Sequence, residues 1–294
     1  MTIPLNIIAD LEQMWGYPFM RNAIEAGTLT AIVAGITGYF VVLRRSAFTA
    51  HAFSEIGFAG AAGAVLVGIP PLAGLLIGSN LGGLAIALLG RRAANRDTQI
   101  GIVLAFALGL GLLFIGLYPG YATQTYSILF GEILGVSQEQ VIETLAAAVG
   151  MLVVMGVIYR PLLFASVDED VAEAKGIPML ALGIVFMAVV AVAVSFAVEV
   201  TGVLLIFSLM VTPGATASYM TSRPSRAILA SVIIALFATW IGLFLSFYTP
   251  YPVSFFITTE VFVLYLFVRF IYSRFTVEKI SPGSLLRPPV DRSG

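Results

Sequence analysis

The protein has a single histidine, His51, and a glutamate follows it four residues later at Glu55. Residues i and i+4 share one face of a helix, so an imidazole and a carboxylate would point the same way there. Neutral imidazole is a ligand for Zn, Mn or Fe and a carboxylate adds charge, so the pair could form half of a divalent-cation site. The alternative is a polar pair that ties helices together, or an accidental pairing near a helix end, because two ligands alone do not make a site.

The stretch around this pair, residues 44–63, is otherwise mostly apolar (RRSAFTAHAFSEIGFAGAAG). Ionisable groups on a membrane helix are costly to leave facing lipid, and they usually line a bundle interior or a substrate path. Small residues let neighbouring backbones approach closely, and here they are Gly57, Ala59, Gly60, Ala61, Ala62, Gly63 and Ala64. The helix is therefore predicted to carry both a polar face and a tight packing seam.

Three further positions could take part in transport. Glu260 is the other acid deep in an apolar run, and we treat it as a weaker candidate ligand, since a buried carboxylate needs a partner or a proton. Glu199 and Glu132 lie nearer the predicted outer surface, where solvation also explains them. Pro213 and Gly214 close a later apolar run, and they predict either a packing kink or a moving hinge, because proline removes a backbone donor.

Membrane helices must position these groups. The chain is 59% hydrophobic and 11% charged, with a mean hydropathy of +1.01, whereas soluble domains are about 25% charged. A span needs about 20 mainly apolar residues, which predicts an all-α polytopic membrane protein with nine transmembrane helices. The predicted spans are residues 24–43, 47–68, 71–90, 98–117, 141–163, 179–198, 202–220, 227–247 and 253–272.

The basic residues support the count of nine. All of the 15 Lys and Arg residues except Arg21 then fall on one side, which the positive-inside rule makes cytoplasmic. The N-terminus is predicted outside and the C-terminus inside. Merging the sixth and seventh spans would leave eight spans and would place Arg223 and Arg226 outside.

The segments between the spans predict smaller elements. Residues 10–25 are expected to form an interfacial helix anchored by Trp15, Tyr17 and Phe19, and residues 118–140 an outer loop with a re-entrant or surface helix. Residues 166–178 predict a short cytoplasmic helix, with acids in its first turn, Lys175 in its last and Gly176 as its stop. Residues 1–279 are expected to form one permease domain, and the polar, Pro-rich residues 280–294 a disordered cytoplasmic tail.

Several function classes are excluded by what the sequence lacks. The chain has no Cys, one His, no phosphate-binding loop and no H-E-x-x-H, so it is a poor enzyme candidate and cannot hydrolyse ATP alone. A net charge of -1 gives no indication of nucleic-acid binding. No permanently bound cofactor is expected.

Several segments together resemble the membrane permease subunit of the ATP-binding cassette (ABC) importers for zinc, manganese and iron. They are LRR at 43–45, DTQIGIV at 97–103, LFGEILGVS at 129–137, DEDVAEAKGI at 168–177 and GVLLIFSLMVTPGATA at 202–217. The resemblance implies a bacterial cell membrane, a homodimer of this chain within membrane lipid, cytoplasmic ATPase subunits that use ATP, an extracytoplasmic metal-binding protein and a divalent metal ion as substrate. It also implies that the ATPase contact lies near Asp168, Glu169, Asp170, Glu173, Lys175 and Gly176.

Two departures from the family pattern are visible. The family usually carries Asp and then His four residues later, whereas the aligned positions here hold His51 and Glu55, so acid and imidazole exchange places. The ligand chemistry survives, but the geometry and metal preference do not carry over. The last turn, residues 248–253, also lacks the usual Asp and Gly.

Three other functions remain open from the sequence. The first is a permease for a metal chelate such as a siderophore or cobalamin, which a larger cavity would favour. The second is a proton-coupled secondary carrier with Glu260 and His51 as titrating groups. The third is an intramembrane hydrolase, which the missing catalytic set makes a poor candidate.

Overall fold

Every regular element in the described part of the chain is helical. The computed structural model describes residues 7–89, 96–118, 131 and 133–279. The elements are α1 (Ile7–Gly16), α2 (Pro18–Leu43), α3 (Ala47–Leu66), α4 (Pro71–Leu89), α5 (Arg96–Leu117), the short 3-10 helix η2 (Ile133–Gly135), α7 (Gln138–Val167), α8 (Glu169–Ala174), α9 (Met179–Thr201), α10 (Val203–Met220), α11 (Pro224–Tyr248) and α12 (Val253–Lys279).

Six of the helices in these ranges are long and apolar enough to cross a membrane: α2, α5, α7, α9, α11 and α12. The helices α4 and α10 contain shorter apolar stretches, Pro71–Ile86 and Leu205–Met220. The predicted all-α membrane architecture is therefore confirmed.

The first membrane helix begins earlier than predicted. Pro18 occupies the first turn of α2, where its missing N–H costs nothing and its fixed φ favours the helix. The expected helix over residues 10–25 is therefore divided between α1 and the start of α2. Trp15, Tyr17 and Phe19 are exposed, at 55%, 40% and 44%, as an interfacial anchor requires.

The predicted break between the sixth and seventh spans is confirmed. The helices α9 and α10 are separated by Gly202 alone, which adopts φ +83° and ψ 160°. That backbone region is essentially restricted to glycine, so this residue both ends α9 and starts α10. Most of the predicted outer loop, and the tail 280–294, lie outside the described residues.

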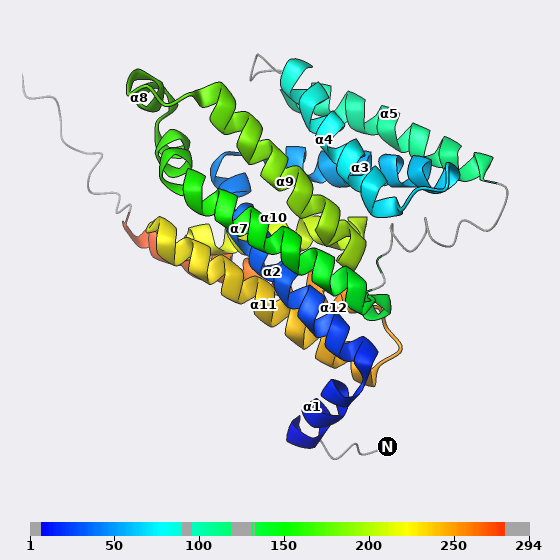
Figure 1. The fold of residues 1–294 in the computed structure, drawn as a ribbon. Helices are drawn as coiled ribbons and strands as arrows, with labels where there is room; N and C mark the ends of the chain where they lie inside the picture. Colours follow the sequence, from blue (N-terminus) through cyan, green and yellow to red (C-terminus); the bar gives the residue numbers. More distant parts are fainter. Residues whose placement is uncertain (1–6, 90–95, 119–130, 132, 280–294) are drawn as a thin grey trace, which may run out of the picture.

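The helices form two groups joined by α9. Figure 1 shows α3, α4 and α5 together on one side, and α3 packs against both α4 and α5. On the other side α2 packs against α10 and α11, and α12 packs against α10 and α11. The helix α9 contacts α4 and α3 as well as α2 and α7, so it connects the two groups.

The predicted seam of small residues lies between α3 and α4. A methyl group on Gly60 would collide with the carbonyl oxygen of Gly74, and one on Gly74 would collide with that of Gly60. On Gly78, it would come within 2.8 Å of the Ile56 carbonyl oxygen. The backbones of α3 and α4 are therefore in direct contact, as is usual where small residues drive helix association in membranes.

We expect Gly60→Ala to lower the stability of the protein by about 1–3 kcal/mol, because the added methyl group must push α3 away from α4. Thermal unfolding in detergent measures the change. Gly109→Ala on α5 is the matched control, since its methyl group would meet nothing within 4 Å. Equal melting temperatures for the two variants would contradict the contact.

Candidate functional site

A tight turn sets the start of the helix that carries the candidate ligands. After α2 ends at Leu43, the Arg45 N–H donates to the Val42 carbonyl (3.0 Å) and the Ser46 N–H donates to the Val41 carbonyl (2.8 Å). Arg45 adopts φ +54°, a left-handed conformation that is uncommon outside glycine. This connection sets where α3 begins, and His51 lies one helical turn after that start.

His51 lies partly inside the bundle. Its ring is half-buried and sits 5.1 Å from the Phe207 ring on α10, in an edge-to-face arrangement, with Phe48 at 6.4 Å. Its Nδ1 atom is shielded and has no hydrogen-bond partner within the described ranges. The imidazole therefore retains an unused ring nitrogen inside the protein.

Glu55 lies one turn further along α3 and is only 8% exposed. Between residues described by the structure, it makes no hydrogen bond and no ion pair that would satisfy its carboxylate. A carboxylate withdrawn from lipid without a partner is costly, so it is expected to bind a proton or a cation.

The described residues of one copy of the chain show no closed metal site. Within the part of the chain that the structure describes, no group of three or more His, Asp or Glu residues is arranged to hold a metal ion. The arrangement at His51 and Glu55 can provide two ligands and an open coordination sphere, which suits passage better than retention.

A buried serine contact, which sequence reasoning missed, ties α3 to its neighbours. The Ser79 hydroxyl on α4 donates to the Phe53 carbonyl on α3 (2.9 Å). Ser195 on α9 lies 3.3 Å from the Ser79 hydroxyl and donates to the Ala191 carbonyl (2.8 Å). Isolated serines in apolar runs give no sequence signal, although such hydroxyls commonly join membrane helices.

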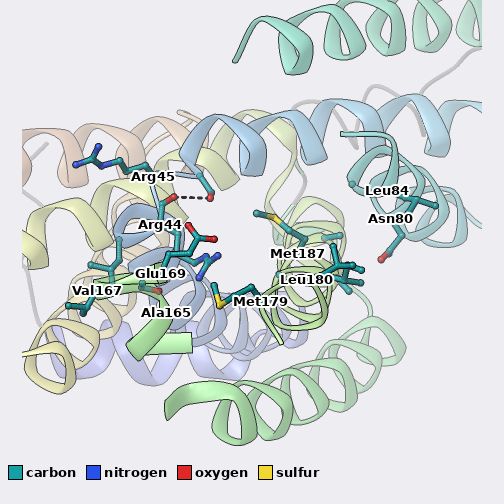
Figure 2. Close-up of a pocket in the computed structure, with 18 residues that line it drawn as sticks. Arg44, Arg45, Asn80, Leu84, Ala165, Val167, Glu169, Met179, Leu180 and Met187 are labelled. Atoms are coloured by element: carbon teal, nitrogen blue, oxygen red, sulfur yellow. Dashed lines mark hydrogen bonds between the residues drawn. The ribbon is translucent and has the colours of Figure 1, made fainter. Parts of the chain in front are cut away.

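A hollow lies where α2, α4, α7, α8 and α9 approach one another (Figure 2). It has a volume of about 650 Å³. Arg44, Glu169 and Met179 lie on one side of it, with Asn80 and Leu84 on the other. The hollow therefore combines charged and apolar walls, and it collects helix ends that the charge pattern predicts on one side of the membrane.

The predicted short helix after the fifth span is confirmed as α8. The Asp168 carboxylate accepts a hydrogen bond from the Val171 N–H (3.0 Å), and Gly176 ends the turn with φ +82°. Lys175 lies 5.1 Å from the Phe164 ring on α7. The acidic residues Glu169, Asp170 and Glu173 are exposed, and Glu169 also borders the hollow.

Pro213 and Gly214 lie inside α10, which continues through both of them. Both residues are buried, and a methyl group on Gly214 would come within 2.8 Å of the Gly38 backbone on α2. The segment is therefore the crossing point of α2 and α10.

Glu260 and Glu199 lie apart from His51. Glu260 is on α12, where it lines a second hollow of about 540 Å³ against α11, and both of its carboxylate oxygens are shielded without a partner. Glu199 accepts a hydrogen bond from Gln140 (3.2 Å), which joins α9 to α7. Glu132 lies outside the described residues.

We expect Asp168→Ala to destabilise α8 by about 1 kcal/mol, because the first turn loses its capping acceptor. Hydrogen exchange of the Val171 amide measures the change directly. Asp168→Asn is the control, since it keeps an acceptor oxygen and should retain most of the protection. Equal exchange rates in Asp168→Ala and the parent would exclude a capping role.

Apolar helices of membrane length, with ionisable side chains withdrawn from lipid, define the class of this molecule as a multi-pass membrane protein with features of a transport subunit. The family model described as "ABC 3 transport family" matches residues 16–272. The chain belongs to this family, which confirms the resemblance found in its sequence segments.

Relatives with transport names cover most of the chain. It is 28% identical over 242 residues to the manganese transport system membrane protein MntC of Halalkalibacterium halodurans, which covers 82% of this chain and 83% of that protein. It is 30% identical over 239 residues to the chelated iron transport system membrane protein YfeC of Yersinia pestis, covering 81% of each.

Two solved structures share the fold. PsaBC from Streptococcus pneumoniae, in complex with Fab, superposes with a TM-score of 0.81 at 26% identity, covering 89% of this chain and 95% of that one. A metal-chelate type ABC transporter in an inward-facing conformation superposes with a TM-score of 0.71 over 92% of this chain and 91% of that one. At 12% identity, the second likeness concerns the fold alone.

Proposed function

We propose that this chain is the membrane permease subunit of an ABC importer for a divalent transition metal, Zn, Mn or Fe. The observation that carries the proposal is the family match over residues 16–272, together with relatives named for manganese and chelated-iron transport. The chain supplies the path, and separate ATPase subunits use ATP to drive it.

His51 and Glu55 are the proposed ligands on that path. Glu55 is buried and His51 is half-buried, and the Nδ1 atom of His51 has no hydrogen-bond partner within the described bundle. Imidazole and carboxylate suit the borderline metals of this series. Coordination on the path would be transient, since tight binding would impede release.

A homodimer would complete the ligand set. One chain offers two ligands, and transition metals in proteins commonly have four. Phe48 and Phe207, which flank His51, are 41% and 37% exposed, so this face can meet a second copy. A two-fold axis near His51 would bring two imidazoles and two carboxylates to one cation.

The proposed topology has nine spans, with the N-terminus outside and the C-terminus inside. It is supported by the break at Gly202 and by the hollow that gathers Arg44, Arg45 and the start of α9 at one end. On this topology α8 faces the cytoplasm, where its exposed acids would contact an ATPase subunit. An extracytoplasmic metal-binding protein would deliver the ion at the opposite end.

Movement between inward and outward states is assigned to the α2–α10 crossing. Pro213 leaves one backbone carbonyl of α10 without its helical donor, and Gly214 removes the side chain at the contact with Gly38. ATP-driven closure of the ATPase subunits would shift α10 against α2 there. Glu260 lies on α12, which packs against α10 and α11, and it stays a weaker candidate ligand.

A metal chelate is the second candidate substrate. It is supported by the name of the Yersinia pestis relative, which refers to chelated iron. A chelate would need a wide cavity and few protein ligands. A free ion would need His51 and Glu55.

The deciding experiment is ATP-dependent uptake of zinc, manganese and iron by proteoliposomes that hold the reconstituted complex. We expect His51→Ala and Glu55→Ala each to reduce uptake of the transported metal by about tenfold or more, because each removes a ligand. Gln13→Ala, at an exposed position on α1, is the control. ATPase activity and assembly should persist in all three.

The exchanged ligand order gives a sharper variant. The double change His51→Asp and Glu55→His restores the order usual in the family while keeping one imidazole and one carboxylate. We expect it to recover uptake above either alanine variant, with an altered metal preference. Unchanged uptake in both alanine variants would show that the pair is structural, and uptake of a chelate but of no free ion would favour the second candidate.

Single-cysteine labelling tests the nine-span topology, because the chain has no native Cys. In intact cells we expect Ser222→Cys, in the turn between α10 and α11, to resist a membrane-impermeant thiol reagent until the membrane is opened. Ala174→Cys on α8 is inside whether α9 and α10 are one span or two, so it is the control. Labelling of Ser222→Cys alone would support eight spans.

A further inference from the structure

We propose that the hollow between α2, α4, α7, α8 and α9 binds an anionic phospholipid. Arg44 and Arg45 would hold the phosphate, and apolar side chains of α4 and α9 would cover an acyl chain. The inference is independent of the metal substrate. It rests on the proposed topology only for placing the hollow in the inner leaflet.

The charged end of the hollow is built by the α2–α3 turn. Arg44 reaches into the hollow beside Glu169, and Arg45 extends outward at the rim (Figure 2). The Arg44 guanidinium lies 5.7 Å from the Phe186 ring, which holds it between α2 and α9. Among the described lining residues Arg44 and Arg45 are basic and Glu169 is the one acid, so these residues together carry a net positive charge.

Arg45 occupies a backbone position that glycine or asparagine would fill with less strain. Its φ of +54° is the only left-handed value outside glycine among residues with described backbones. Keeping a long cation there costs stability, and a guanidinium at the rim of a membrane cavity is a group that binds phosphate well. Strained residues of this kind cluster at functional sites.

Part of the wall of the hollow is apolar and exposed. Leu84 on α4 is 53% exposed, and Leu180 and Ile184 on α9 are 78% and 51% exposed. These side chains lie on two neighbouring helices that border the same space. An acyl chain lying between them would cover apolar surface across the hollow from Arg44.

This combination favours a phospholipid over a soluble anion. A free phosphate would use only the arginines and would leave the apolar walls uncovered. A basic pocket between transmembrane helices on the cytoplasmic side is the usual form of an anionic headgroup site. Because Glu169 is also the first residue of α8, a bound lipid would lie against the base of that helix.

Fluorescence quenching by brominated lipids tests the site. The chain has two tryptophans, Trp15 and Trp240, so Trp15→Phe with Trp240→Phe gives a silent background. Leu180→Trp then reports on the hollow, in the full complex reconstituted with phosphatidylcholine. Increasing amounts of brominated phosphatidylglycerol or brominated phosphatidylcholine are added, and the relative affinity follows from the two quenching curves.

Leu229→Trp in the same background is the matched reporter. Leu229 lies near the start of α11, is 61% exposed, and does not line the hollow. It should be quenched equally by the two lipids. We expect Leu180→Trp to show at least about a fivefold preference for phosphatidylglycerol, the ratio that one nearby arginine typically gives.

The arginine variants test whether the α2–α3 turn is responsible for the preference for phosphatidylglycerol. Arg44→Gln and Arg45→Asn, each made in the Leu180→Trp reporter, should each reduce the preference about fivefold. Asparagine tolerates the left-handed backbone, so Arg45→Asn should fold, and its melting temperature checks this. Arg223→Gln, in the turn before α11, should change nothing.

Three results would overturn the proposal. The first is equal quenching by both lipids at Leu180→Trp. The second is a preference that is unchanged from that of the Leu180→Trp reporter in both arginine variants. The third is loss of the preference when millimolar glycerol phosphate is added, because the hollow would then recognise a soluble phosphate. None of these outcomes depends on metal uptake, so the lipid site and the transport function can fail separately.

Discussion

The direct backbone contact between α3 and α4 is the interaction on which the candidate path depends. In a membrane, helices gain little from burying apolar side chains against each other, because lipid is equally apolar. Close approach at Gly60 and Gly74 replaces that driving force with backbone packing, and the Ser79 hydroxyl adds a hydrogen bond to the same pair. The helix with His51 and Glu55 is thereby held on one side by α4, which leaves its imidazole face toward α10.

The placement of polar groups follows from the cost of exposing them to lipid. Glu55 and Ser195 are buried between helices, whereas the acids of α8 are exposed. The guanidinium of Arg44 is held beside an aromatic ring at the end of α2, where headgroups and water can reach the hollow. The proposed ion path and the proposed headgroup site therefore lie in separate parts of the molecule.

Two glycines control how the second group of helices is connected. Gly202 allows a reversal between α9 and α10 within one residue, and Gly214 allows α10 to cross α2 at backbone distance. Both positions lie in the segment that resembles the family at residues 202–217. The same small residues therefore serve the topology and the proposed movement, because a side chain at either position would prevent the chain from adopting this path.

The sequence by itself determined the helical membrane class, the break near Gly202, the α8 helix and the placement of His51 and Glu55 one turn apart on one helix. These features depend on local signals: long apolar runs, a glycine or proline at a boundary, and an i, i+4 spacing within one helix. The predicted start of the first span, at residue 24, was later than the observed start of α2 at Pro18. The aromatic and charged residues around Pro18 had indicated an interfacial segment there.

Only the tertiary structure decided which helices meet. It placed Glu260 on α12 against α11 rather than against α3, joined Ser79 and Ser195, which lie 116 residues apart, and assembled the hollow from α2, α4, α7, α8 and α9. Long-range contacts of this kind arise from the packing of whole helices, whose apolar surfaces are nearly equivalent in composition. The residues that select one arrangement, such as Gly60 and Gly74, act through the absence of a side chain, which a single sequence does not distinguish from an ordinary small residue.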